Sequence, residues 1–237
     1  MKHKNNELNV KIYEDTLSKS RKYESGKTCK HFFNGKFDIV DNKKGEIKVL
    51  PLDSVTAGEY FNVGKTCILN MASYKRPGGG VERGSNAQEE CLFRCSNLGL
   101  SISPNFYPLK QDEALYTQDA TFIKDFHYKD ITPFVCDVLT IAAVNLNSTF
   151  LKQDDYIELT FEKINFLFKI ARNYKVDNLI LGAWGCGVFK NDPEFMADSF
   201  KKVLEQYRSG FENIVFAVIN DHNSVANNYE IFKKHLG

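Results

Sequence analysis

The chain has 237 residues, 43% of them hydrophobic and 26% charged, and its 31 lysines and arginines nearly balance its 30 aspartates and glutamates to a net charge of +1. These proportions are typical of a soluble globular chain and exclude a disordered tail protein or a coiled coil. The near-zero charge excludes bulk attraction to DNA or acidic lipid as the main function.

The first 55 residues precede the regular part of the chain. Met1–Asn6 leads directly into polar sequence, and no apolar run approaches the ~18 residues of a membrane helix, so we expect a cytoplasmic protein with no membrane partner. Residues 5–24 have a loosely helical apolar spacing, and residues 27–53 carry aromatic and β-branched residues between glycines. We expect residues 1–55 to form an N-terminal extension made of a helix and a hairpin.

Beyond residue 65, short apolar runs alternate with helical patterns. Such runs are typical of strands buried on both faces, which favours a sheet with parallel character covered by helices. The alternation predicts a single α/β domain over residues 1–237. The predicted strands are 66–72, 135–144, 178–183 and 214–219; the predicted helices are 86–99 with a capping box of Ser85 and Gln88, 154–174, 193–208 with Pro193 behind the capping residue Asp192, and 224–236.

The six cysteines and five histidines do not form a metal-site pattern. Cys91 and Cys95 have the one-face spacing of a helix rather than the C-x2-C spacing of zinc ribbons, and the histidines form no closely spaced pair. Reduced cysteine behaves as a small apolar residue. We therefore expect buried free thiols, no metal and no redox cofactor.

The most informative segment joins the predicted strand 66–72 to the predicted helix 86–99. It contains three consecutive glycines, Gly78, Gly79 and Gly80, which can adopt positive φ and let backbone N–H groups approach a ligand closely. In open α/β sheets, ligands bind beyond the carboxyl ends of the strands, where this loop begins. The loop is therefore the first candidate for a binding site.

Glu89 and Glu90 follow in the first turns of the predicted helix, and two interpretations are open. They could complement the helix dipole, with Glu90 paired to Arg94 one turn later. Alternatively, neighbouring carboxylates beside a ligand loop influence each other's ionisation, so that one keeps a proton near neutral pH. That suits glycoside hydrolysis, in which an acid protonates the leaving oxygen and a carboxylate activates water. The adjacent glycines favour the second interpretation.

The glycine triplet, followed after seven residues by Gln88-Glu89-Glu90, resembles the signature of poly(ADP-ribose) glycohydrolases. The surroundings are similar to the bacterial-type, macrodomain-like branch of that family, and the resemblance covers roughly residues 60–220 in motif order. Ala142–Asn145 reads Ala-Ala-Val-Asn where the family has Ala-Ala-Pro-Asn. The similar segments are Leu69–Ser73 before the loop, Gln88–Arg94 after it, and Gly182–Phe189 further on.

The resemblance implies a macrodomain-like three-layer α/β sandwich with a mixed central sheet. It also implies hydrolysis of the ribose–ribose O-glycosidic bonds of poly(ADP-ribose), with release of ADP-ribose and no cofactor or metal. Glu90 would be the general acid and then the base, Glu89 with support from Gln88 would position ribose hydroxyls, and backbone groups of Gly78–Val81 would hold the reacting ribose. The substrate would be the polymer or an ADP-ribosylated protein, and general nucleic-acid binding is not expected.

A second glycine loop follows the predicted strand 178–183. Such a strand–loop–helix unit presents N–H groups to an anion, although glycines at strand ends also serve simple turns. The resemblance implies that this loop holds the diphosphate of ADP-ribose, with Phe189 against the substrate unless it is a core residue. Asn70 could bond a ribose hydroxyl or cap a turn, and Trp184 is expected in the core. The residues predicted to bind substrate from this loop are Gly185, Cys186, Gly187, Val188 and Phe189.

Two other functions fit the same motifs. One is an ADP-ribose reader that binds without turnover, for which the loops alone suffice and the glutamate pair is superfluous. The other is a glycohydrolase for another ADP-ribosyl linkage, on protein or on nucleic acid. The dense aromatic residues of segment 106–128 either cover the pocket or pack in the core.

Overall fold

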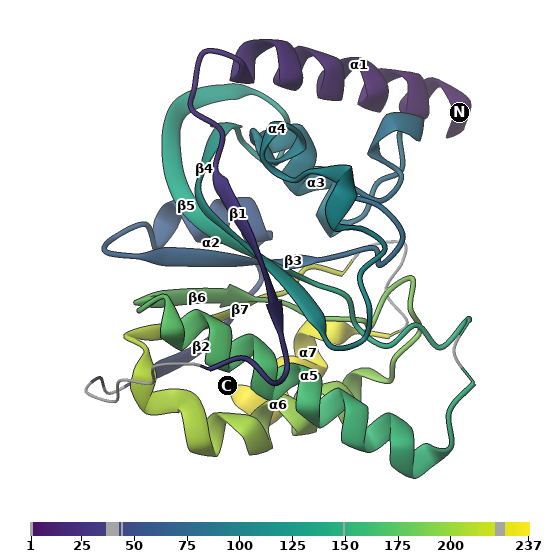
Figure 1. Cartoon of the computed structure of the whole chain (residues 1–237), viewed down its shortest axis with the longest axis vertical. Helices are drawn as coiled ribbons and strands as arrows, with labels where there is room; N and C mark the ends of the chain where they lie inside the picture. The colour runs from purple at the N-terminus through teal and green to yellow at the C-terminus, as the bar shows by residue number, and fades with distance from the viewer. Residues whose placement is uncertain (1, 37–42, 44, 149, 221–225) are drawn as a thin grey trace.

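The computed structural model describes residues 2–36, 43, 45–148, 150–220 and 226–237, which form a three-layer α/β/α sandwich around a mixed sheet (Figure 1). The seven strands are β1 (Lys27–Phe32), β2 (Glu46–Leu50), β3 (Thr66–Met71), β4 (Glu113–Lys124), β5 (Asp130–Ile141), β6 (Asn178–Leu181) and β7 (Asn213–Ala217). Their order is β1-β4-β5-β3-β6-β7-β2. The five strands β5, β3, β6, β7 and β2 run parallel to one another, whereas β4 is antiparallel to both β1 and β5.

Helices cover both faces of the sheet (Figure 1). One layer contains α1 (Lys2–Ser20), α2 (Ser54–Tyr60), α3 (Gln88–Cys95) and α4 (Leu98–Ser101), with the short turns η1 (Val81–Arg83) and η2 (Pro104–Phe106). The other contains α5 (Gln153–Asn173), α6 (Pro193–Tyr207) and α7 (Asn228–Leu236), with the turn η3 (Arg208–Gly210). Within the described ranges, none of these helices combines the length and the apolar character needed to cross a membrane.

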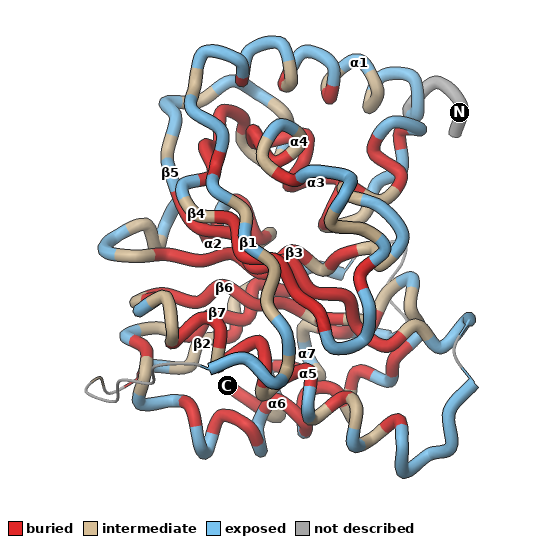
Figure 2. Tube along the Cα trace, in the orientation of Figure 1, coloured by how far each residue is buried: buried red, intermediate tan, exposed pale blue. Residues whose placement is uncertain are grey.

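The period-two alternation of side chains along the central strands divides the hydrophobic core in two. In β3, Ile68 faces the layer of α1–α4 and Leu69 faces the layer of α5–α7, and Ile180 and Leu179 of β6 do the same. Because both faces are covered, the central strands are buried along most of their length, as Figure 2 shows. This double burial explains why these strands read as continuous apolar runs.

The predicted three-layer sandwich with a mixed sheet is confirmed, and most predicted elements need only small shifts at their ends. β3, β6 and β7 occupy the predicted apolar runs, and α5 differs from its predicted range by one residue at each end. Pro193 begins α6 behind Asp192, whose side chain accepts the Glu194 N–H at 3.2 Å, as predicted. Of the predicted helix 224–236, residues 224 and 225 lie outside the described residues, and α7 begins at Asn228.

The predicted helix 86–99 is shorter than expected, and its predicted capping box is wrong. Ala87 occupies the N-cap position, and its N–H is bonded at 2.9 Å by the carboxylate of Glu90 rather than by Ser85 or Gln88. α3 ends at Cys95 because Ser96 forms an isolated β-bridge to β4, with α4 as a separate turn beyond it. The helix ends because Ser96 pairs with β4. Such a tertiary contact is not visible in the helical periodicity of the sequence.

The predicted N-terminal hairpin is also wrong. β1 pairs with β4 and β2 pairs with β7, so the two strands lie at opposite edges of the sheet and not side by side. The predicted helix is present as α1, which packs across α3 and η1 (Figure 1). Strand β4, in the aromatic segment 106–128, was not predicted.

The expectation of buried free thiols fails at one position. Cys29 is exposed on the edge strand β1, whereas the other five cysteines are buried and free. β1 lies at the edge of the sheet, where fewer neighbours cover a side chain, and the sequence does not show which strand is the edge.

Candidate active site

The first glycine loop, Gly78–Gly80, turns the chain from the carboxyl end of β3 towards α3. Gly78 and Gly79 have φ angles of +68° and +55°, in the left-handed region that glycine adopts freely. A Cβ on Gly79 would lie 2.6 Å from Oε1 of Glu90 and 2.9 Å from Oε2 of Glu89. The loop therefore closes directly onto both carboxylates, and only glycine fits at its centre.

The carboxylate of Glu89 is held from three sides. The Ser73 N–H donates to Oε2 at 2.7 Å and the Gly78 N–H donates to Oε1 at 3.2 Å. The side-chain amide of Asn70, at the end of β3, reaches the same Oε1 at 3.5 Å and also donates to Thr140 on β5 at 3.2 Å. Glu89 is thus tied both to the sheet and to the glycine loop.

The carboxylate of Glu90 is held by backbone N–H groups from the glycine loop and from the residue that precedes α3. The Gly80 N–H donates to Oε1 at 2.8 Å and the Ala87 N–H donates to Oε2 at 2.9 Å. Arg94, which could have paired with Glu90 one helical turn later, instead donates to the Ser85 carbonyl at 2.8 Å and to the side-chain oxygen of Asn86 at 2.7 Å. Glu90 therefore does not form the ion pair that a generic helix start would favour.

Burial alters the ionisation of this pair. Glu89 and Glu90 are only 4% and 7% exposed, so their charges are poorly solvated. Desolvation raises the pKa of Glu89 to about 8, and the neighbouring charge of Glu90 acts in the same direction, against the hydrogen bonds from Ser73, Asn70 and Gly78. At neutral pH Glu89 accordingly retains a proton.

Gln88 fixes the start of α3 to its surroundings. Its side-chain amide donates to the Leu69 carbonyl at 2.8 Å and to the Ser54 hydroxyl at 3.1 Å, and its carbonyl oxygen accepts the Met71 N–H at 2.9 Å. One side chain thus joins β3, α2 and α3. These hydrogen bonds fix the position of the start of α3, and with it the two glutamates, relative to the carboxyl end of β3.

The second glycine loop, Gly185–Gly187, follows β6, which lies beside β3 in the sheet. Gly185 has a φ of +80°, and a Cβ there would lie 2.6 Å from the side-chain amide of Asn191. That amide, nearly fully buried, bonds the carbonyls of Gly185 at 3.1 Å and Val144 at 2.8 Å. At Gly187, in contrast, an added Cβ would meet open space, so its backbone is accessible to a ligand.

The two loops border one cavity of about 400 Å³, which we call the carboxylate cavity. Asn70, Gly78, Val81 and Cys186 are buried beneath its wall and do not line it. Trp184 lines the cavity but is buried, as predicted, and its indole N–H donates to the Ile141 carbonyl at 3.2 Å. The predicted site residues that do line it are Gly79, Gly80, Gln88, Glu89, Glu90, Gly185, Gly187, Val188 and Phe189.

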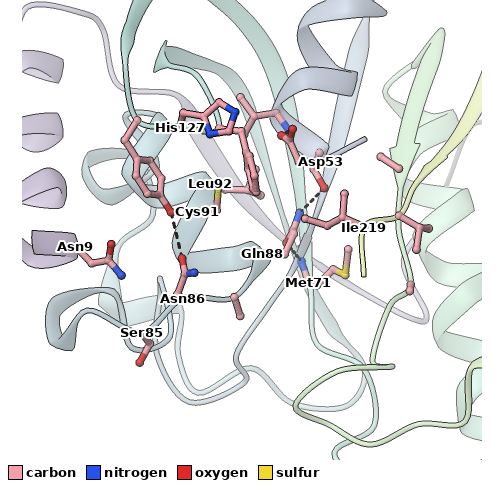
Figure 3. Close-up of a pocket in the computed structure, with 18 of the residues that line it drawn as sticks. Asn9, Asp53, Met71, Ser85, Asn86, Gln88, Cys91, Leu92, His127 and Ile219 are labelled. Carbon is pink, nitrogen blue, oxygen red and sulfur yellow. Dashed lines mark hydrogen bonds between the residues drawn. The ribbon is translucent and has the colours of Figure 1, made fainter. Parts of the chain in front are cut away.

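A larger cavity of about 700 Å³, the adjoining cavity, shares Met71, Ser85, Ala87, Gln88 and Ala183 with the first. Figure 3 shows Gln88 between Met71 and the start of α2, where Asp53 caps the helix. The far wall comes from α1 and from the turn between β4 and β5. The aromatic residues Phe126 and Tyr128 in that turn line this cavity, so part of segment 106–128 belongs to a pocket wall.

Sequence reasoning missed several residues that shape the site. Asn191 braces the second glycine loop, and Arg94 braces the residues before α3, yet each reads in the sequence as an ordinary polar residue. The position of Asn191 directly before the capping residue Asp192 was the one available signal. The carboxylate cavity is also lined by Arg76 and Arg83, which flank the glycine loop.

The arrangement can carry out acid–base chemistry. Two buried carboxylates share a cavity with backbone N–H groups, and one of them keeps a proton at neutral pH, which is how a site supplies both an acid and a base. Among the described residues, no group of three or more His, Cys, Asp or Glu side chains could hold a metal ion. Such chemistry, on an α/β sandwich, suits a hydrolase.

Comparison with known proteins identifies the family. The family model described as microbial-type PARG, catalytic domain, where PARG is poly(ADP-ribose) glycohydrolase, matches residues 2–125. The chain therefore belongs to this family of glycohydrolases, as its motifs predicted. No protein of curated function matches it in sequence.

Solved structures show the same fold. The poly(ADP-ribose) glycohydrolase of Thermomonospora curvata is 23% identical with a TM-score of 0.84, covering 97% of this chain and 100% of that one. Its complex with the inhibitor ADP-HPD is 22% identical with a TM-score of 0.82, covering 96% of this chain and 99% of that one. The Deinococcus radiodurans enzyme in complex with ADP-ribose is 23% identical with a TM-score of 0.74, covering 97% of this chain and 91% of that one. The expected macrodomain-like fold is thereby confirmed.

The contact between Gly79 and the carboxylates yields a first prediction. Gly79→Ala should lower the free energy of unfolding by about 1–2 kcal/mol through its positive φ alone, and should displace both carboxylates and abolish turnover. Gly35→Ala is the control, because no atom of the described residues lies close to a Cβ placed at Gly35. Urea unfolding and an activity assay compare the two; a fully active Gly79→Ala enzyme would contradict this geometry.

Proposed function

We propose that the protein hydrolyses the ribose–ribose O-glycosidic bonds of poly(ADP-ribose) and releases ADP-ribose. The observation that carries the proposal is the pair Glu89 and Glu90, buried under the first glycine loop and facing the second across one cavity. A reader without turnover needs the loops but not two desolvated carboxylates, whose burial is expensive. The family to which the chain belongs supports the same conclusion.

In the proposed mechanism, the proton that Glu89 retains passes to Glu90, and Glu90 protonates the leaving ribose oxygen. The bond between the anomeric carbon and that oxygen breaks with its electron pair going to the oxygen, which leaves an oxocarbenium-like ribose. The Glu90 carboxylate then takes a proton from water as the water adds to the anomeric carbon. Glu89 supplies this proton and, through its bond to the Gly78 N–H, holds the glycine loop in place.

The two cavities suggest how ADP-ribose is placed. Its reacting ribose would lie against Gly79 and Gly80, which border the carboxylate cavity. Its diphosphate would approach the open backbone at Gly187, and its adenosine would extend into the adjoining cavity past Gln88. Asn70 is fully buried under Glu89, so we assign it to positioning Glu89 rather than to a ribose contact.

Exchanging each glutamate for glutamine separates the two roles. Both oxygens of each carboxylate accept a backbone N–H. In either variant the new side-chain NH2 group therefore faces one backbone N–H, so the two variants carry the same structural perturbation. Glu90→Gln should lower kcat by ~10²–10⁴-fold with ADP-ribose affinity within a few-fold. Glu89→Gln should lose less rate and more affinity.

Steady-state kinetics on purified polymer and calorimetric titration with ADP-ribose measure both effects. A dead Glu89→Gln enzyme beside an active Glu90→Gln enzyme would reverse the roles. Full activity in both variants would refute the mechanism, and binding without turnover by the unmodified protein would establish a reader.

The proton on the pair predicts the pH dependence. Because the pKa of Glu89 is raised to about 8, Glu89 loses its proton as the pH rises through that value and no longer supplies the acid for the leaving group. We expect kcat/KM to fall above about pH 8, and expect Glu89→Gln to abolish this limb. A rate that rises through pH 8 in the unmodified enzyme would show that the proton is not used.

The open backbone at Gly187 gives a test of the diphosphate subsite. Gly187→Val should fold normally, because the added Cβ comes close to none of the residues that the structure describes, but its branched side chain would occupy the path of the phosphates. Calorimetry should show ADP-ribose affinity falling by at least about tenfold, the loss of one charge-assisted hydrogen bond. Gly35→Val serves as control, and unchanged affinity in Gly187→Val would place the diphosphate elsewhere.

A further inference from the structure

Two arginines border the carboxylate cavity without any acidic partner. Arg76 and Arg83 both line this cavity and are exposed. Neither takes part in an ion pair or side-chain hydrogen bond with any residue that the structure describes. In a chain whose charges nearly cancel, two unpaired guanidinium groups beside one cavity form a local positive field.

The backbone fixes both arginines to the glycine loop. The Arg76 carbonyl accepts the Gly79 N–H at 3.3 Å, and the Arg83 N–H donates to the Gly80 carbonyl at 2.9 Å. Their main chains therefore have fixed positions relative to the residues that close onto Glu89 and Glu90. Both arginines border the same cavity as the two carboxylates.

The adjoining cavity has the opposite character. Among its described lining residues there is no lysine or arginine, and its one carboxylate, Asp53, caps α2 through hydrogen bonds to the Val55 and Thr56 N–H groups. Positive charge is therefore confined to the cavity of the reacting ribose. On that side a second anionic group, beyond the released ADP-ribose, would find a counter-charge.

The chemistry of the polymer supplies such a group. Its leaving oxygen belongs to the adenosine ribose of the next unit, and that ribose carries a diphosphate. A single ADP-ribosyl group on a protein side chain has no phosphate on the leaving side. A planar guanidinium binds phosphate oxygens in pairs.

We propose that Arg76 and Arg83 bind the diphosphate of the unit on the leaving side, and so make the enzyme selective for linked ADP-ribose units over a single protein-attached group. This inference rests on the proposed function and identifies its preferred substrate.

The test compares binding of ADP-ribose and of its ribose-linked dimer, in the Glu90→Gln background so that the dimer stays intact. The parent should bind the dimer about tenfold more tightly than ADP-ribose, the gain expected from two exposed charge-assisted contacts. Arg76→Gln combined with Arg83→Gln should remove this preference while changing ADP-ribose affinity less than about twofold, and should flatten the salt dependence of dimer binding. Arg21→Gln, an exposed arginine that lines neither cavity, should change nothing.

Two results would overturn the inference. If the double substitution weakens binding of ADP-ribose by the same factor as binding of the dimer, each compared with the Glu90→Gln parent, the arginines serve the released unit's own diphosphate. If its preference for the dimer persists, they contact no phosphate. Turnover of the dimer by the unmodified protein is measured alongside: its absence would refute the proposed function, whereas the binding comparison decides the role of the arginines by itself.

Discussion

The burial of two neighbouring carboxylates is the constraint on which the rest of the site depends. A desolvated carboxylate requires hydrogen-bond donors, and Glu89 and Glu90 obtain four of theirs from backbone N–H groups. To bring those groups inward, the chain must curl over the start of α3, which forces positive φ at Gly78 and Gly79. The glycines, the glutamates and the helix start thus form one unit.

The sheet determines what faces this unit. β3 and β6 are adjacent and parallel, so the loops that leave their carboxyl ends emerge side by side and border a common cavity. Further hydrogen bonds fix the position of each loop. Gln88 links α3 to β3, and Asn191 links the second loop to the Val144 carbonyl, just beyond β5. The site is therefore rigid because of residues behind its walls.

The sequence predicted the central fold and the carboxylate motif because both depend on local patterns. Apolar runs such as 178–181 mark strands buried on both faces, and the spacing from the glycine triplet to Glu90 is visible in the chain itself. What it could not predict depends on distant partners. The edge positions of β1 and β2, the exposure of Cys29 and the brace from Asn191 all follow from contacts with segments far along the chain. The end of α3 at Cys95 is likewise set by β4, where the bridge from Ser96 to Phe122 is made.

The edge strand β2 has a consequence for the order in which the molecule is assembled. Among the residues that the structure describes, strand 46–50 pairs with residues 213–217 alone, which the ribosome adds long afterwards. Such distant pairing makes folding slow, since the closure entropy of a long loop precedes the energetic gain. A growing chain thus holds both glycine loops before it can complete the sheet beneath them.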